Sequence, residues 1–209
     1  MDIVDDIAVD DFCKIYYDSI VYDNTFWIGV QTQKCPLDLW IYQEIIFEVK
    51  PDVIIECGTY KGGTSLYLAS ICEMLEHGEV ITIDKNRVSQ CCHARMIKLH
   101  GSSISEEVVA DVNKLLVGKD RVMVILDSSH VKSHVMKELE IYSQYVSVGS
   151  YIIVEDTIVN GHPVWTDFGD GPMEAVGEFL KKDNRFVVDH SREKFYLTFN
   201  RNGYLKRVQ

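Results

Sequence analysis

The chain has 209 residues, of which 46% are hydrophobic, and it carries a formal net charge of −11. This length provides for one sizeable hydrophobic core and is too short for two full domains. The negative charge disfavours a nucleic-acid partner, because binding to phosphates requires a basic surface. The sequence has no apolar run of about eighteen residues and no signal-peptide pattern at its start, which predicts a cytoplasmic protein without a membrane partner.

The first fifty residues differ in pattern from those that follow. An acidic leader and a short helix are expected first, and a loop at 22–30 contains several aromatic residues. A second helix is predicted at 37–49, because Asp38 lies near its start and Pro51 would stop it. Residues 1–50 are therefore predicted to form a helical and loop extension that packs over the site.

Residues 51–209 alternate between strand and helix patterns and are predicted to form a single domain. Continuous apolar runs rich in Val and Ile are typical of parallel strands that are buried on both faces. Strands are expected at 53–55, 80–83, 96–99, 122–126 and 151–154, with helices at 64–76, 105–116 and 131–145. This alternation predicts an α/β fold with a doubly wound, mostly parallel sheet.

The alternation of strand and helix patterns ends near residue 185. Two apolar segments, 185–189 and 195–199, are separated by only a short polar one. A parallel crossover needs about a dozen residues or more, so these segments are predicted to form a C-terminal antiparallel hairpin. The sheet would then have seven strands, of which the last is antiparallel to the others.

A glycine-rich segment at 56–64, ECGTYKGGT, follows the first buried strand and opens a helix. Glycines allow close approach of a ligand to the backbone, and the helix N-terminus offers free N–H groups. The spacing matches neither G-x-G-x-x-G nor the P-loop, which disfavours nicotinamide dinucleotides and nucleoside triphosphates. Glu56 can accept a hydrogen bond from a ligand ammonium group, and Asp84 ends the next strand, where an acidic residue often binds ribose hydroxyls. A tight turn without a ligand is the alternative interpretation.

Three carboxylates, those of Asp127, Glu155 and Asp156, follow two later strands. The ends of parallel strands meet at one edge of a sheet, where these groups would repel each other without a cation. Oxygen ligands alone favour a hard ion such as Mg²⁺. Turn formation and helix capping are the alternative roles for these residues.

The segment 122–205 resembles the cephalosporin hydroxylase family. The matching stretches are 124–130, 149–157, 160–164, 171–176 and 192–195, and residues 22–27 and 37–40 resemble the family's N-terminal signature. Members of this family are understood as metal-dependent S-adenosylmethionine (SAM) methyltransferases, several of which act on hydroxyls of antibiotics or sugars. The resemblance implies a class I methyltransferase fold of Rossmann-like type, and a more distant resemblance to catechol O-methyltransferase concerns the metal site.

The resemblance implies a role for each site residue. The methionine part of SAM would contact Glu56, Gly58 and Tyr60, with Thr64 near its carboxylate. Asp84 would bind the ribose hydroxyls, and Ser103 would lie beside the adenine. Asp127, Glu155 and Asp156 would hold Mg²⁺, and Asp127 would also border SAM. Residues 85–99 match no pattern of the family, so the adenine end is the least defined.

The implied reaction is methyl transfer to a hydroxyl of a small natural-product or sugar-like acceptor. His130 is predicted to be the general base, because imidazole accepts protons near neutral pH. His130 and His134 can alternatively form a metal pair one helical turn apart. An Fe(II) oxygenase is disfavoured because, of the seven histidines, only His77 has an acidic residue two positions later, Glu79, and that pair precedes the strand expected at 80–83.

A non-catalytic cofactor-binding protein is the other alternative, and a homo-oligomer is possible. The acceptor is not defined by the sequence. Aromatic and histidine residues that can line its pocket are Trp27, Trp40, His162, Trp165 and Phe168.

Overall fold

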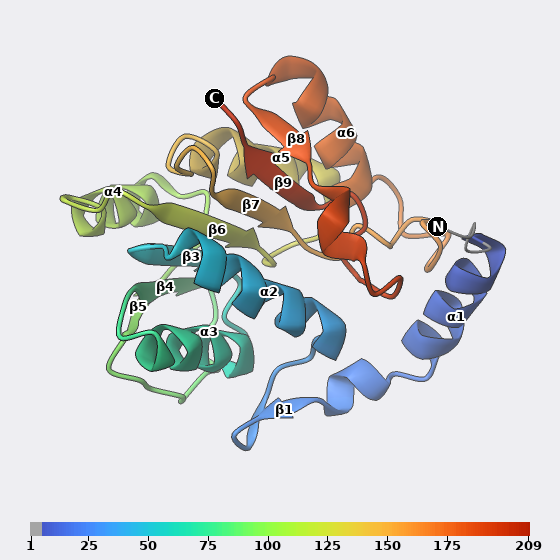
Figure 1. Ribbon diagram of the computed structural model, residues 1–209, viewed down its shortest axis with the longest axis horizontal. Coiled ribbons are helices and arrows are strands. Elements are labelled where there is room, and N and C mark those ends of the chain that lie inside the picture. Colours follow the sequence, from blue (N-terminus) through green and yellow to red (C-terminus); the bar gives the residue numbers. More distant parts are fainter. Residues whose placement is uncertain (1–5) are drawn as a thin grey trace.

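The computed structural model describes residues 6–209, and its centre is a seven-stranded sheet with helices on both faces (Figure 1). Its strands are β3 (Val53–Cys57), β4 (Glu79–Asp84), β5 (Met96–His100), β6 (Val122–Leu126), β7 (Tyr151–Val154), β8 (Phe186–Val188) and β9 (Tyr204–Arg207). They lie in the order β5-β4-β3-β6-β7-β9-β8. The first five are parallel, and β9 is antiparallel to both of its neighbours. The predicted fold class is confirmed.

Helices cover the two faces of this sheet and enclose two hydrophobic clusters. One face packs against α2 (Pro36–Val49) and α3 (Gly63–Met74). The other face packs against α4 (Glu106–Leu115), α5 (Lys132–Tyr142) and α6 (Pro172–Lys182). Side chains alternate along each strand, so Ile54 belongs to the first cluster while Val53 and Ile55 belong to the second. Burial on both faces explains the apolar runs of β6 and β7.

The predicted hairpin exists, but its second strand was placed too early in the sequence. The strand β8 pairs with β9, with Val187 opposite Lys206. Segment 195–199 is instead irregular and follows the short 3-10 helix η2 (His190–Glu193). Leu197 and Phe199 are buried there in a third hydrophobic cluster. The apolar pattern of 195–199 therefore reflects burial without strand pairing.

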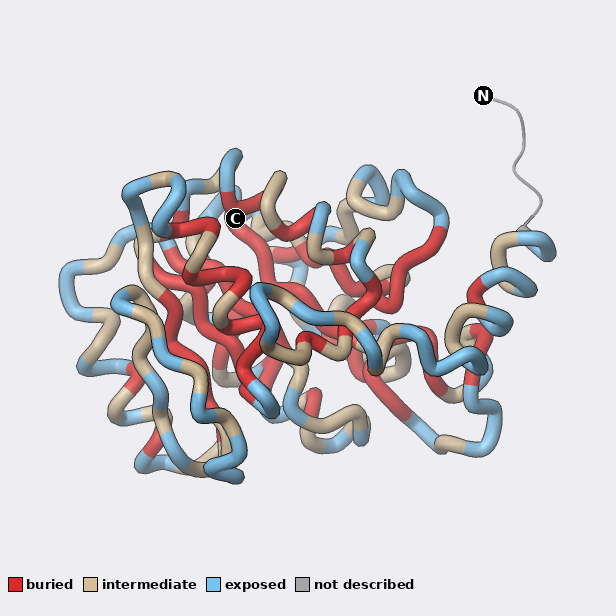
Figure 2. The backbone as a smooth tube through the Cα atoms, turned by 90° about the horizontal axis from the view of Figure 1, so that it is seen from below, coloured by how far each residue is buried: buried red, intermediate tan, exposed pale blue. Residues whose placement is uncertain are grey.

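The N-terminal elements are α1 (Asp6–Asp18), η1 (Val21–Asn24), β1 (Phe26–Trp27) and β2 (Val30–Gln31). Helix α1 lies beside the sheet and its covering helices (Figures 1 and 2). Cys13, Tyr16 and Tyr17 attach α1 to the third cluster, which contains Phe199. The acidic leader, residues 1–5, lies outside the described residues.

The segment 25–34, which we call the strap, passes over the start of α3. A Cβ atom built on Gly63 would lie 2.2 Å from the carbonyl oxygen of Gln31, so strap and helix are in close contact. The predicted boundary at residue 50 falls between α2 and β3, and both elements contribute to one cluster. Within residues 6–209, no helix is long and apolar enough to cross a membrane.

Candidate active site

A cavity of about 590 Å³ opens at the carboxyl ends of the parallel strands. The segments that follow β3, β4, β5 and β6 line it, together with Asp156 after β7 and parts of α1, η1 and the strap. Strand connections run outward in opposite directions from β3 and β6, which are neighbours. Ligands of doubly wound sheets bind in the crevice at such a switch point.

The glycine loop is closely packed at this switch point. Gly58 has a φ of +108°, and a Cβ atom there would lie 2.0 Å from the carbonyl oxygen of Asp127. Only glycine combines this backbone conformation with such a short distance between the loops. The loop after β3 and the loop after β6 therefore form one continuous wall of the cavity.

Glu56, predicted to contact the methionine part of a cofactor, is fully buried and does not line the cavity. One carboxylate oxygen accepts hydrogen bonds from the hydroxyls of Ser65 and Thr82. The other oxygen has no hydrogen-bond partner. Burial raises the pKa of Glu56 to about 7, although the two hydroxyls oppose this shift. Its predicted contact remains a prediction.

Asp84, predicted to bind ribose hydroxyls, lies on the cavity wall and also forms hydrogen bonds with the neighbouring loops. Its carboxylate accepts hydrogen bonds from the backbone N–H groups of Tyr60, at 2.8 Å, and Asn86, at 2.7 Å. Tyr60 and Thr64 also line the cavity, and the Thr64 hydroxyl donates to the carbonyl oxygen of Thr32 in the strap. The structure thus brings these three predicted residues together.

Ser103 lines the cavity at the end that follows β5 and belongs to a buried polar network. Its hydroxyl donates to Glu138 at 2.5 Å, and that of Ser128 donates to the same oxygen at 2.6 Å. The Nε2 atom of His134 lies 3.1 Å from the Ser128 hydroxyl. His134 is therefore in contact with Ser103, Ser128 and Glu138 at this end of the cavity.

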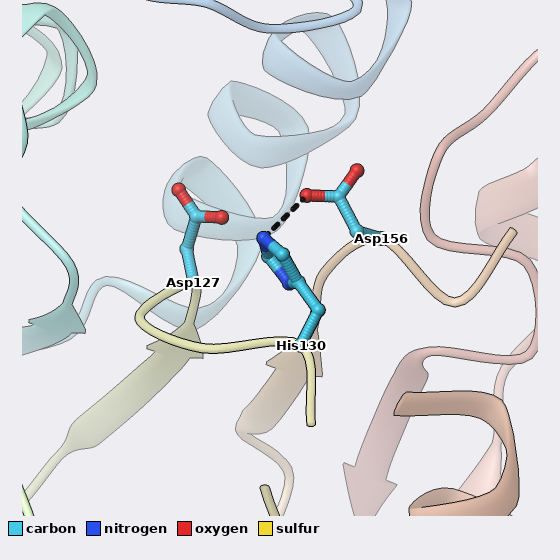
Figure 3. Close-up of side chains that lie close together, drawn as sticks. All are labelled: Asp127, His130 and Asp156. Carbon is cyan, nitrogen blue, oxygen red and sulfur yellow. Dashed lines mark ion pairs between the residues drawn. The ribbon is translucent and has the colours of Figure 1, made fainter. Parts of the chain in front are cut away.

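Asp127, His130 and Asp156 converge on another part of the cavity (Figure 3). One potential ligand atom from each lies within 4.8 Å of those of the others. The Nε2 atom of His130 is 3.3 Å from a carboxylate oxygen of Asp156. Two carboxylates and an imidazole supply oxygen and nitrogen donors of the kinds that bind divalent cations.

Lys34, at the end of the strap, is bound to two of the predicted acidic residues. Its ammonium group lies 2.5 Å from Asp127 Oδ2 and also contacts Glu155 Oε2. The side chain is only 6% exposed. Burial lowers the pKa of Lys34, but the charges of Asp127 and Glu155 outweigh burial and raise it, so the ammonium stays charged.

Glu155, predicted to bind the metal, does not belong to the cluster of Asp127, His130 and Asp156. It is 2% exposed, and one of its oxygens contacts Lys34 while the other has no hydrogen-bond partner. Burial and the nearby charge of Asp127 raise the pKa of Glu155, and Lys34 opposes this shift.

Aromatic side chains line the cavity on the side of the N-terminal elements. Tyr17 and Tyr22 stack with ring centroids 5.3 Å apart, and Phe199 packs edge-on against both. Trp165 also lines this cavity and is 57% exposed. Of the predicted aromatic pocket residues, Trp165 reaches the cavity, whereas Trp27 packs on Tyr67.

Lys34 is a residue of the candidate site that the sequence interpretation did not name. It is the only charged residue between Asp23 and Asp38. The sequence does contain one indication, a single lysine shortly before Pro36 in a chain with three converging carboxylates. Lys34 is far from those carboxylates in the sequence, so their contact could not be predicted.

Comparison with known families identifies relatives over almost the whole chain. The family model described as Rhamnosyl O-methyltransferase/CmcI matches residues 19–208. A rhamnosyl O-methyltransferase of Mycobacterium bovis (strain BCG / Pasteur 1173P2) is 34% identical, over 97% of this chain and 86% of the relative. That of Mycobacterium leprae (strain TN) is 32% identical, over 97% of this chain and 91% of the relative.

Solved structures share the same fold. The Mg-SAM form of CmcI superposes with a TM-score of 0.69 at 21% identity, covering 90% of this chain and 78% of that chain. MycE methyltransferase in complex with Mg, SAH and mycinamycin VI gives a TM-score of 0.51 at 22% identity, covering 68% of this chain and 40% of that chain. The match of the family model, together with 34% identity over 97% of the sequence, shows that this chain belongs to the Rhamnosyl O-methyltransferase/CmcI family of methyltransferases.

Proposed function

We propose that this chain is a SAM- and Mg²⁺-dependent O-methyltransferase that acts on a hydroxyl of a small, sugar-like acceptor. The observation that carries the proposal is the convergence of Asp127, His130 and Asp156 in the cavity that the glycine loop also lines. The names of the relatives support a sugar hydroxyl as the acceptor class.

The residues that line the cavity fit both SAM and Mg²⁺. Gly58 and Asp127 lie close together, and both line the cavity of about 590 Å³. Gly58, Tyr60, Thr64, Asp84 and Ser103 line it and would hold SAM. When bound, SAM would supply an activated methyl group on its sulfonium.

The carboxylates of Asp127 and Asp156, with His130 beside them, would hold Mg²⁺. Glu155 stays a predicted ligand, and its unpartnered buried oxygen is consistent with that role. When bound, Mg²⁺ would make the acceptor hydroxyl more acidic.

The chain's own residues would then move the proton and orient the acceptor. His130 lies on the cavity wall and would accept the hydroxyl proton, and Asp156, 3.3 Å from its Nε2 atom, would stabilise the imidazolium. The aromatic rings of Tyr17, Tyr22 and Trp165 would pack against the acceptor and exclude water.

Transfer of a labelled methyl group from SAM to soluble rhamnosides tests the proposal, with metal-free protein and with added Mg²⁺. We expect transfer that depends on Mg²⁺ and that Asp127→Asn abolishes. Asp111→Asn, in an exposed position on α4, is the matched control and should retain activity. Undiminished transfer in the presence of a chelator would contradict the metal assignment.

Calorimetric titration with SAM tests the cofactor site without an acceptor. Asp84→Ala should weaken binding by about 1.5–3 kcal/mol, the contribution of a hydrogen bond to a charged group. Asp84 also accepts a hydrogen bond from the backbone N–H of Tyr60, so the thermal stability of the variant should be measured in parallel to detect a loss of folding. Unchanged affinity would remove Asp84 from the SAM site.

A further inference from the structure

The loop between β7 and α6, residues 155–171, brings an exposed aromatic side chain into the cavity. Trp165 lies in this loop, lines the cavity and is 57% exposed. Its φ of +49° is in the left-handed region, which bulky residues rarely adopt. Such a conformation persists only where surrounding contacts hold it, so the contacts of this loop indicate what fixes Trp165.

Glu174, in the first turn of α6, is the residue to which this loop is bound. Its Oε1 atom accepts a hydrogen bond from the side-chain amide of Asn160 at 3.0 Å and lies 2.8 Å from Nε2 of His162. Its Oε2 atom accepts a hydrogen bond from the backbone N–H of Gly171 at 2.7 Å. Glu174 thus holds the loop at points before and after Trp165.

Asn160 and the charge of Glu174 strengthen this attachment. The Oδ1 atom of Asn160 accepts a hydrogen bond from the backbone N–H of Gly169 at 3.1 Å, so Asn160 bridges the two sides of the loop. Burial raises the pKa of Glu174, but hydrogen bonds from His162, Gly171 and Asn160 outweigh burial and lower it to about 2. Glu174 is therefore ionised at neutral pH, and hydrogen bonds to a charged acceptor are stronger than those between neutral groups.

The cavity therefore combines a polar part with an aromatic part that the fold holds in place. Asp127, His130 and Asp156 form the polar part. In the aromatic part, Phe168 packs against Trp165 with ring centroids 4.9 Å apart, and more than half of the Trp165 surface stays uncovered.

A small acceptor that contacts both parts must present hydroxyls to one and apolar C–H groups to the other. A pyranose ring can do so, because the C–H groups on one face of the ring pack against the electron-rich face of an indole. An open-chain polyol has similar hydroxyls and no such face.

We propose that Trp165 is a specificity-determining residue that selects cyclic sugar acceptors over open-chain polyols, and that Glu174 is the positioning residue that fixes it. Because the loop is already held in this conformation, the acceptor need not order Trp165 when it binds. Trp165 contacts the face of the sugar ring and not the reacting hydroxyl, so it contributes to acceptor binding and leaves the rate of methyl transfer unchanged. This inference rests on the acceptor class of the proposed function.

Fluorine NMR tests the contact without any methyl transfer. Protein labelled with fluorotryptophan has one signal for each of its three tryptophans, and Trp165→Phe identifies the signal of Trp165 by its loss. With Mg²⁺ and S-adenosylhomocysteine, which has no methyl group to transfer, methyl α-L-rhamnopyranoside should shift that signal. Rhamnitol, the matching open-chain polyol, should leave it unshifted. Equal shifts with the two compounds, or a rhamnoside effect that spares Trp165, would overturn the proposal.

Steady-state kinetics measures the selection itself. Trp165→Ala should raise KM for the rhamnoside about tenfold and change kcat by less than about threefold, because only ground-state binding is lost. The constant for rhamnitol, from turnover or from competitive inhibition, should stay within about twofold of the wild-type value. An unchanged preference for the ring over the open chain would overturn the proposal.

Trp40→Ala is the matched control for Trp165→Ala. Trp40 lies on α2 and has a similar exposure of 58%, but it does not line the cavity. This variant should change the kinetics of neither compound.

Glu174→Gln tests the positioning role. The amide nitrogen that replaces one carboxylate oxygen cannot accept a hydrogen bond, so the variant loses part of its attachment to the loop. We expect the fluorine signal of Trp165 to shift or broaden in the free protein. KM for the rhamnoside should rise at least about threefold, with kcat within about twofold of the wild-type value.

The control for Glu174→Gln is Glu140→Gln, in an exposed position on α5, which should alter neither the signal nor KM. Lower thermal stability of Glu174→Gln with an unmoved Trp165 signal would show a purely structural role and would overturn the assignment of Glu174.

The proposed function and this inference can fail separately. A shift of the Trp165 signal without methyl transfer would support the inference and refute the proposed activity. Methyl transfer to rhamnosides with an unchanged KM in Trp165→Ala would overturn the inference and leave the proposed function intact. Absence of both the shift and the transfer would refute the acceptor class and, with it, the inference.

Discussion

His130 and Asp156 are 3.3 Å apart between imidazole nitrogen and carboxylate oxygen. If His130 is the base, His130→Ala should lower kcat by about 10²–10⁴-fold, the usual effect of losing a general base. SAM affinity should stay near the wild-type value. Steady-state kinetics across a range of pH would measure the change, and the acidic limb of the profile should shift or disappear.

The control for this variant is His190→Ala, since His190 is exposed on η2. It should leave kcat and its pH profile unchanged. A His130→Ala enzyme with raised KM, retained kcat and an unaltered profile would show that His130 orients the acceptor and does not remove its proton.

Glu56 makes the stability of the cofactor-free chain depend on pH. Its pKa is raised by burial to about 7 from an ordinary value of 4.5. The folded state therefore binds this proton more strongly than the unfolded state, and stability is lost as pH rises from about 4.5 to 7. The loss amounts to about 3 kcal/mol at 1.36 kcal/mol for each unit of pKa.

Urea denaturation of the wild type and Glu56→Gln at several pH values would measure this contribution. The variant cannot ionise at this position, so the stability of the wild type relative to the variant should fall across that window. Glu107→Gln, on the exposed face of α4, should show no such trend. A constant difference between wild type and Glu56→Gln would contradict the prediction.

At the scale of single elements, contact between the strap and α3 depends on Gly63. A methyl group there would meet the Gln31 carbonyl at 2.2 Å and displace the strap. We expect Gly63→Ala to destabilise the chain by about 1–3 kcal/mol and to weaken SAM binding, as over-packing does. Chemical denaturation and calorimetry would measure the two effects.

Gly177 provides the matched control for Gly63. It lies within α6, and a Cβ atom there would have no neighbour within 4 Å. Gly177→Ala should stabilise the chain by up to about 1 kcal/mol, because alanine favours helix. Equal behaviour of the two variants would show that the strap adjusts freely to a side chain at position 63.

The elements that the sequence predicted best are those with continuous burial. The strands β3, β6 and β7 are entirely buried, and their apolar runs have no other simple explanation. The helix α6 was not predicted, although Pro172 at its start is a helix signal. Segment 195–199 was misassigned because packing against α1 produces the same apolar composition as pairing in a sheet.

At the scale of the whole molecule, Asp38 connects α2 with a segment 160 residues away. Its carboxylate accepts hydrogen bonds from Thr198 Oγ1 at 2.5 Å, the Phe199 N–H at 2.9 Å and the Tyr204 hydroxyl at 2.8 Å. Asp38→Ala would leave these buried donors without an acceptor, so we expect a loss of at least about 3 kcal/mol. Urea denaturation would measure it.

Asp111→Ala, on the exposed surface of α4, serves as the control and should change the unfolding free energy by less than about 0.5 kcal/mol. A loss of under about 1 kcal/mol for Asp38→Ala would mean that water or a neighbouring group replaces the carboxylate.

The part of the candidate site that could be predicted from the sequence is the part that lies at the carboxyl ends of the parallel strands. Asp84, Asp127 and Asp156 all follow parallel strands, so their meeting at one edge of the sheet is a property of the topology. Lys34 was not predictable in this way, because its place depends on the path of the strap over α3. Tertiary packing also decided that Glu155 faces Lys34 while its neighbour Asp156 joins His130.

The last strand in the sequence, β9, lies between β7 and β8 and not at an edge of the sheet. During synthesis, β7 therefore presents an open hydrogen-bonding edge until residues 204–207 have left the ribosome. The nascent chain must protect that edge from other chains, because nothing earlier in the sequence fills the position. A premature stop shortly before residue 204 would thus remove an interior strand and leave β8 without its neighbour.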